Sequence, residues 1–354
     1  MSALLERLGI EHPIIVAPMA GGPSTVDLVV AASGAGALGS FGAAYLSPQQ
    51  IRDAIEQTRA RTSKPFAVNL FAPLPGPPPF DVTAALAALR VYHEELGIAP
   101  PALADLPDPR DAFDAQIDAL LESAAPVVSF TFGIPPRETL ARLTSAGIFV
   151  IGTATTVDEA VAFERAGAGA IVAQGSEAGG HRGTFAVPFE RGLIGTMALV
   201  PQVADAVRVP VIASGGIMDG RGIAAGLALG ASAAQLGTAF LATPESGASA
   251  AQKAALRAAH EDDTAITMAF SGRPARGIRN RVMRELDAHP EAIAPYPLQN
   301  ALTRAMRAGA AAAGKDQYLS MWSGQAPRLV RTMPAGELVR TLVRETNDVL
   351  RSLR

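Results

Sequence analysis

Residues 209–238 read VPVIASGGIMDGRGIAAGLALGASAAQLGT and contain one complete strand–helix–strand unit. Two short apolar runs, 209–213 and 233–236, flank a stretch of helical spacing at residues 220–229. Apolar runs of this length joined by a helix are typical of parallel strands that are buried on both faces. The fold therefore depends on how often this unit recurs along the chain.

Apolar runs of the same kind occur throughout the first half of the sequence, at residues 14–17, 37–41, 66–71, 127–132, 148–151 and 170–173. Amphipathic segments at residues 48–61, 136–146 and 157–166 separate several of them. Eight such runs in all predict an α/β fold, a (β/α)8 TIM barrel. A doubly wound sheet is the alternative, but no G-x-G-x-x-G motif comes directly after the first strand, at the turn into the following helix.

Two segments interrupt the alternation and predict additions to the barrel. Residues 72–123 begin with a proline-rich stretch and form an excursion after the third strand. Residues 244–315 are Ala-rich and predict an inserted, mainly helical cap that carries the substrate. The barrel itself is then expected to comprise residues 1–243 and 316–354, ending in an outer helix at 335–353.

The composition excludes several classes of function. Lys and Arg total 30 against 33 Asp and Glu, a formal charge of −3, so nucleic acid is not an expected partner. The absence of Cys excludes thiolate nucleophiles and iron–sulfur clusters, and no His spacing predicts a metal site. Redox chemistry would need a cofactor. The N-terminus lacks a signal peptide pattern, and glycines interrupt the uncharged stretch 28–51, so we expect a cytoplasmic protein without membrane spans.

Glycine-rich and amide-bearing strand ends mark the expected site, because barrels bind ligands where their strands end. The seventh run ends in Ser214, Gly215 and Gly216, and the eighth contains Gln235 and Leu236 before Gly237 and Thr238. Paired glycines let backbone N–H groups approach a phosphate, although tight turns also need glycine. Asn69 and Gln174 place amides that could contact a heterocycle, and Ala17, Pro18, Met19 and Ala20 could pack against a planar ring.

The segment QGSEAGGHRG, residues 174–183, leaves the sixth strand as a long glycine-rich loop. It carries His181, the only His that we expect at the barrel mouth. An imidazole titrates near neutral pH, which makes His181 the candidate general base, and an ordinary surface-loop His is the alternative.

With these residues assembled, the chain resembles the nitronate monooxygenase family, which comprises FMN-containing barrels. The likeness spans nearly the whole chain and rests on these motifs: HPIIVAPM (12–19), GSFG (39–42), NLF (69–71), EAGGH (177–181), SGG (214–216), QLGT (235–238) and MWSGQ (321–325). The glycine motifs occur in many FMN barrels. The EAGGH run is also similar to FMN-dependent enoyl-acyl-carrier-protein reductases.

The resemblance implies oxidation of alkyl nitronates, such as propionate 3-nitronate, by FMN and O2 to an oxo compound and nitrite. It implies His181 as the catalytic base and FMN bound by residues 17–20, Asn69, Gln174, Gly179, Gly180, 214–216 and 235–238. Lys315 and Tyr318 are the expected anchors for an anionic substrate, because their segment returns to the barrel mouth. An NAD(P)H-dependent reductase of an enoyl thioester or quinone is the alternative. We expect a monomer or a homodimer.

Overall fold

Eight parallel strands form the predicted barrel in the computed structural model, which describes residues 3–74, 76, 80–101 and 110–353. The strands are β1 (Ile14–Val16), β2 (Gly39–Gly42), β3 (Phe66–Phe71), β4 (Val127–Thr131), β5 (Phe149–Ala154), β6 (Ala170–Gln174), β8 (Val211–Ser214) and β9 (Ala233–Leu236). Their order is β1-β9-β8-β6-β5-β4-β3-β2, and a parallel bridge between Ile15 and Leu38 joins β1 to the start of β2. The TIM barrel is confirmed, and each predicted apolar run overlaps one strand.

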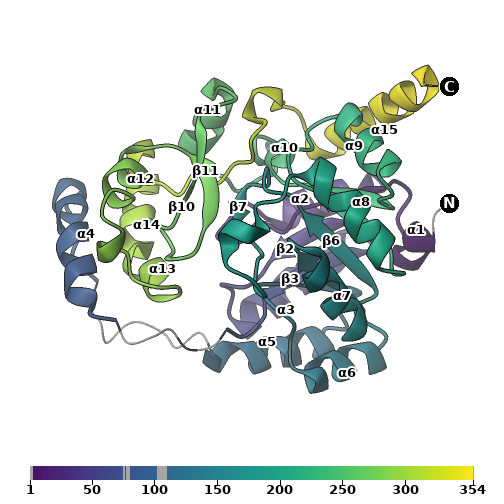
Figure 1. Cartoon of the computed structure of the whole chain (residues 1–354), viewed down its shortest axis with the longest axis horizontal. Helices are drawn as coiled ribbons and strands as arrows, with labels where there is room; N and C mark the ends of the chain where they lie inside the picture. Colours follow the sequence, from purple (N-terminus) through teal and green to yellow (C-terminus); the bar gives the residue numbers. More distant parts are fainter. Residues whose placement is uncertain (1–2, 75, 77–79, 102–109, 354) are drawn as a thin grey trace.

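Helices surround these strands (Figure 1). They are α2 (Val26–Gly34), α3 (Pro48–Arg61), α6 (Arg137–Ser145), α7 (Val157–Arg165), α8 (Thr196–Ala206), α9 (Gly220–Ala228) and α15 (Ala335–Ser352). The side chains of Thr25, Ser47, Thr156 and Asp219 accept hydrogen bonds from the first turns of α2, α3, α7 and α9. These caps fix where the helices begin, because they satisfy N–H groups that have no partner inside the helix.

The strands have two buried faces with different partners. Ile14 and Val16 belong to the large cluster shared with the surrounding helices. Ile15 belongs instead to a smaller cluster with residues such as Val127 and Ile212, which also contains the apolar side chains of α1 (Ala3–Leu8). Because successive side chains of a strand point to opposite faces, this smaller cluster fills the barrel interior. The interior is thus packed near α1, and the carboxyl ends of the strands remain for the site.

The excursion after β3 contributes to two different layers. Its second helix, α5 (Arg110–Glu122), returns to the barrel and packs on α3. Its first helix, α4 (Val82–Leu96), packs on α14 (Arg304–Ala312), and Figure 1 shows it far from the barrel strands. Of the proline-rich stretch, residues 75 and 77–79 lie outside the described residues.

Residues 244–315, here called the cap, combine helices with a strand pair. The helices are α11 (Ala250–Ala258), α12 (Arg281–Leu286), α13 (Leu298–Leu302) and α14, with a 3-10 turn η3 (Pro290–Ala292). The strands β10 (Thr264–Thr267) and β11 (Ala275–Ile278) are antiparallel, and β11 also pairs with β7 (Gly180–His181) from the loop after β6. The cap has its own hydrophobic cluster, which Leu89 of α4 shares with Phe270 and Met306. The boundaries at 243 and 315 stay a prediction.

Shorter elements complete the chain between the barrel and the cap. They are η2 (Phe189–Gly192), α10 (Thr238–Leu241), η4 (Asp316–Tyr318) and η5 (Pro327–Leu329). Within the described ranges, no helix is long and apolar enough to cross a membrane. The uncharged stretch 28–51 is divided among α2, β2 and α3.

Replacement of Gly220 by Ala should destabilise the barrel where α15 packs on α9. A Cβ at Gly220 would lie 2.4 Å from the backbone nitrogen of Thr346, which cannot move without shifting α15. We expect a loss of about 1–3 kcal/mol in the free energy of unfolding, measured by urea denaturation. Gly34→Ala is the matched control, because a Cβ there meets nothing within 4 Å. Equal unfolding midpoints for the two variants would contradict the close α9–α15 contact.

Candidate active site

One cavity of about 620 Å³ lies at the carboxyl ends of the barrel strands, under the cap. Its size is within the range of small-molecule and cofactor sites. His181 and all of the predicted flavin-binding residues except Leu236 line it. Leu236 is buried in the cluster between strands and helices, because it alternates with Gln235 along β9.

Glycines at the ends of β8 and β9 form a cradle of backbone donors. Gly215 and Gly216 have φ angles of +121° and +70°, a conformation that side chains disfavour. A Cβ at Gly215 would also lie 2.7 Å from Oγ1 of Thr196. In the part of the chain that the structure describes, the N–H groups of Gly215, Gly216, Gly237 and Thr238 donate to no protein acceptor. These donors fit a phosphate group.

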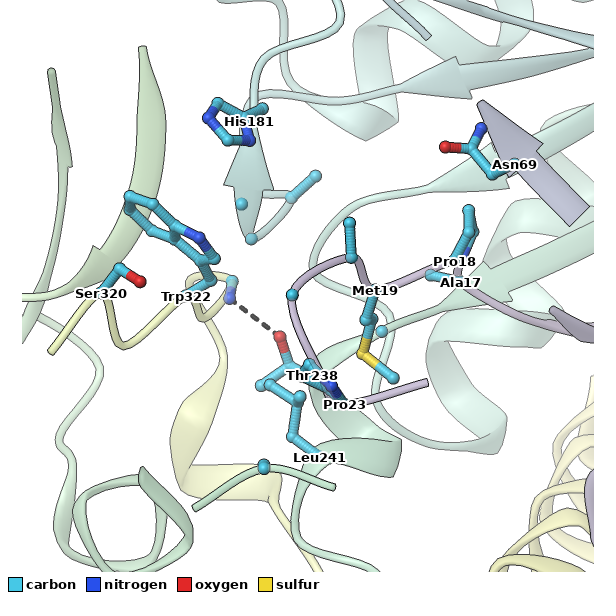
Figure 2. A pocket seen from close by; sticks show the side chains of 18 of the residues that line it. Ala17, Pro18, Met19, Pro23, Asn69, His181, Thr238, Leu241, Ser320 and Trp322 are labelled. Atoms are coloured by element: carbon cyan, nitrogen blue, oxygen red, sulfur yellow. Dashed lines mark hydrogen bonds between the residues drawn. The ribbon is translucent and has the colours of Figure 1, made fainter. Parts of the chain in front are cut away.

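Polar side chains from neighbouring strands surround the middle of the cavity. The amide nitrogen of Asn69 donates to Oγ of Ser129, at 2.9 Å, and to its carbonyl oxygen, at 3.1 Å. Its amide oxygen thus remains for a donor on a ligand, and Figure 2 shows this oxygen directed toward the cavity. Gln235 donates weakly to Oγ of Ser214, at 3.4 Å. Hydrogen-bonding groups for a heterocycle are therefore present beside the phosphate cradle.

The loop after β6 is braced rather than free. The side chain of Gln174 donates to the carbonyl oxygen of His181, at 3.0 Å, and accepts from the N–H of Gly183, at 2.8 Å. Gly179 approaches Ser323 and Gly324 so closely that a Cβ would lie 2.6 Å from the nitrogen of Gly324. That nitrogen donates to Oγ1 of Thr238, as Figure 2 shows. The late Trp-Ser-Gly-Gln motif therefore packs against both the loop and the end of β9.

Aromatic rings enclose His181 at the cavity wall. The rings of Phe71, Phe132, Tyr296 and Trp322 have centroids 5.5–6.2 Å from the imidazole. Nε2 of His181 lies 2.9 Å from Oγ of Ser271 in the cap. Burial, together with the positive charges of Arg273 and Arg307, lowers the pKa of His181 from 6.5 to about 3. The imidazole is consequently neutral at physiological pH, which is the protonation state of a base.

Two arginines that the sequence analysis did not select line the same cavity. Arg304 and Arg307 belong to α14, and no Asp or Glu of the described residues lines the cavity with them. Arg307 donates to the carbonyl oxygen and to Oδ1 of Asn300, at 2.9 and 2.8 Å. The sequence offers no local signal for these cations, because α14 reaches the cavity only through the packing of the cap. They give the cavity an excess of positive charge.

The structure does not bring Lys315 and Tyr318 to the cavity. The ammonium of Lys315 donates to the carbonyl oxygen of Glu95, at 3.1 Å, and the hydroxyl of Tyr318 donates to the carboxylate of the same residue. Arg281 also binds this carboxylate, at 2.7 Å. Lys315 and Tyr318 thus connect α4 to the cap. The prediction that they contact the substrate is corrected, because they lie outside the cavity.

The fold and the site together define a class of protein, the barrels that bind a small molecule or cofactor at the carboxyl ends of their strands. A family model for nitronate monooxygenase matches residues 2–345. The chain is 44% identical to a probable nitronate monooxygenase of Staphylococcus aureus (strain Newman), over 98% of each sequence. It therefore belongs to the nitronate monooxygenase family, the flavin-dependent oxidoreductases that act on nitronates.

Solved structures support the same assignment. The structure of a nitroalkane oxidase from Streptomyces ansochromogenes superposes with a TM-score of 0.93 at 43% identity, covering 100% of both chains. FabK from Thermotoga maritima superposes with a TM-score of 0.79 at 30% identity, covering 100% of this chain and 98% of that chain. The barrel and its additions are thus shared across both relatives.

The imidazole of His181 should stay neutral far below the usual range of a histidine. Because the folded protein does not bind this proton until about pH 3 and the unfolded chain binds it near pH 6.5, acidification between these values favours unfolding. We expect the ring signals of His181, followed by NMR in flavin-free protein, to remain unchanged from pH 8 to roughly pH 5. A titration of His181 above pH 6 would contradict this electrostatic description.

Proposed function

We propose that this chain binds FMN and oxidises alkyl nitronates with O2 to an oxo compound and nitrite. The observation that carries the proposal is the composition of the cavity wall, which combines a neutral imidazole and two arginines with no carboxylate among the described residues. Such a wall attracts an anion and leaves it close to donors. We further expect a monomer or a homodimer in the cytoplasm.

The residues at the strand ends fit FMN in its three parts. The N–H groups of residues 215, 216, 237 and 238 would hold the phosphate, and residues 17–20 would pack against the ring. Asn69, Gln174 and Gln235 would contact its polar edges. When bound, FMN supplies the transfer of electrons from the nitronate to O2, which no side chain of this protein can perform.

The electrostatics of the site favour a nitronate over a neutral nitroalkane. A nitronate is already deprotonated, so its oxidation does not require His181 to accept a proton. The positive charges of Arg273 and Arg307, which weaken His181 as a base, stabilise an anion in the same place. The two arginines therefore disfavour the removal of a proton by His181 and favour the binding of the anionic substrate.

Arg304 and Arg307 also suit a second negative group on the substrate. Arg307 is held by the carbonyl oxygens of Asn300 and Thr303, and these bonds leave its charge uncompensated. A carboxylated nitronate such as propionate 3-nitronate would place its carboxylate against α14. These arginines thus take the role that Lys315 and Tyr318 were expected to have.

The proposed reaction is tested by turnover with two reductants. We expect the purified protein to carry FMN, to consume O2 with ethyl or propyl nitronate, and to release nitrite. NADH added without oxygen should leave the flavin absorbance unchanged over the same period. Rapid bleaching by NADH, without nitrite formation from nitronates, would favour the reductase of an enoyl thioester or a quinone instead.

Removal of the Arg307 charge should affect carboxylated substrates selectively. Because a hydrogen bond to a charged group contributes roughly 1.5–3 kcal/mol, Arg307→Met should raise KM for propionate 3-nitronate by about 10- to 100-fold. KM for propyl-1-nitronate, which lacks the carboxylate, should change much less. Lys315→Met is the matched control and should leave both values unaltered. An equal rise for the two nitronates would exclude Arg307 as the carboxylate anchor.

A further inference from the structure

The turn Ser271-Gly272-Arg273, here called the positioning turn, lies between β10 and β11 and contacts His181 directly. Oγ of Ser271 is 2.9 Å from Nε2 of His181 and 3.0 Å from the carbonyl oxygen of Arg273. It also accepts from the N–H of Arg273, at 3.3 Å. Ser271 itself is 1% exposed, so solvent does not compete for its hydroxyl. The arrangement of protons in this group can therefore be deduced by counting donors.

A hydroxyl has one proton to donate, whereas a carbonyl oxygen can only accept. The contact between Oγ of Ser271 and the carbonyl oxygen of Arg273 is a hydrogen bond only if Ser271 donates to Arg273. Ser271 then has no proton left for His181. The 2.9 Å contact with the imidazole is therefore a bond in which Nε2–H donates to Oγ. In the opposite arrangement, two oxygen lone pairs would face each other at 3.0 Å in a buried site.

We propose that Ser271 is a positioning residue that holds His181 in its Nε2–H tautomer and leaves Nδ1 as the atom that accepts a proton from substrate. The tautomer follows from the hydrogen bonds of the protein alone. The assignment of Nδ1 as the proton acceptor rests on the proposed function and extends it to a neutral nitroalkane, which must lose its α-proton to become the nitronate that is oxidised.

The positioning turn is itself fixed in place. Gly272 has a φ of +74°, and a Cβ there would lie 2.1 Å from the carbonyl oxygen of Ala294 and 2.6 Å from the nitrogen of Tyr296. Only glycine fits this position without moving the neighbouring segment. On the other side, β11 pairs with β7, so that Ala275 lies opposite His181. The position of Ser271 relative to His181 is consequently fixed by two backbone contacts, one with the segment at Ala294 and one with β7.

Arg273 gives the same turn a second effect on His181. Its guanidinium lies 4.0 Å above the ring of Phe132 and donates to the carbonyl oxygen of Thr184, at 2.6 Å. Phe132 in turn packs edge-on against the imidazole, with a φ of +76° that is unusual for a residue with a side chain. The charged and titratable groups around the imidazole are Arg273, Arg307 and Tyr296. The turn thus orients the base and keeps it unprotonated.

The proton transfer is balanced as follows. The C–H bond next to the nitro group breaks, and its electron pair forms the C=N bond of the nitronate while the π pair of one N=O bond moves onto oxygen. The proton forms a new N–H bond at Nδ1. Nε2–H continues to donate to Ser271 throughout, so the imidazolium gains no unsatisfied donor there. The nitronate formed beside it is an anion that the nearby arginines stabilise. For a substrate supplied as a nitronate, this step is absent.

The tautomer is tested by nitrogen-15 NMR of the FMN-loaded protein labelled at histidine. We expect protonated Nε2 and unprotonated Nδ1 for His181, and a slowly exchanging Nε2–H proton. Ser271→Ala should lose the slow exchange, and Ser271→Thr, which keeps the hydroxyl, should retain it. A protonated Nδ1 in the unaltered protein would overturn the proposal, as would equally slow exchange in Ser271→Ala.

Kinetics with two forms of one substrate separate the positioning role from a structural one. Ser271→Ala should lower kcat with nitroethane by about 10- to 100-fold, because the base loses its orientation. KM for nitroethane and the rate with ethyl nitronate should change little, and His181→Asn should show the same selectivity with a larger loss. Equal losses on both forms would overturn the role in proton transfer. A protein that oxidises neither form would refute the proposed function, while the NMR result would still decide the tautomer.

Discussion

The pairing of β7 with β11 is the interaction on which the site depends. β7 belongs to the loop after β6, and β11 belongs to the cap, so two backbone strands join segments about 90 residues apart. The N–H of Arg182 extends the pairing by donating to the carbonyl oxygen of Pro274, at 2.8 Å. This contact adds to the bonds from Gln174 that brace the glycine-rich loop, and it connects the backbone of His181 to the cap. The pairing also sets the register that brings Ser271 and Arg273 to the imidazole, because both precede β11 by a few residues.

The charge of the site follows from the way its arginines are satisfied. Arg182 is 1% exposed, and its guanidinium donates to the carbonyl oxygens of Gly175, Gln174 and Gly192. Arg273 and Arg307 are also held by carbonyl oxygens, and burial lowers the pKa of all three. A carbonyl oxygen satisfies a donor without cancelling its charge, whereas a carboxylate would neutralise it. The arginines therefore keep a positive field at the cavity. Burial is the main reason for the low pKa of His181, the charges of Arg273 and Arg307 lower it further, and the same field suits the site to anions.

The sequence predicted the features that arise from local patterns and missed those that arise from long-range packing. The eight strands and the glycines after β8 and β9 were predictable, because each occupies a short segment with its own period or turn chemistry. That Arg307 rather than Lys315 lies at the cavity was not predictable, since it depends on α4, whose Glu95 binds Lys315 and Tyr318. The strand β7 has only two residues, which is too short for the alternating pattern of apolar and polar residues that predicts a strand. Ser271 is an ordinary turn serine in the sequence, and only the structure brings it to His181.

The positions of the cofactor and substrate groups indicate how specificity can vary in this fold. The cradle and the amides come from the ends of barrel strands. FabK from Thermotoga maritima, at 30% identity, has the same overall arrangement of the chain, with a TM-score of 0.79. The arginines of α14 and the positioning turn come instead from the cap, which contributes no strand to the barrel. If the cap groups act as proposed, a substitution in the cap should change which anion binds, or whether a proton is removed, without altering the groups that fit a phosphate. The proposed function thus makes substrate preference separable from cofactor binding, because the groups assigned to each belong to layers of the protein with different hydrophobic cores.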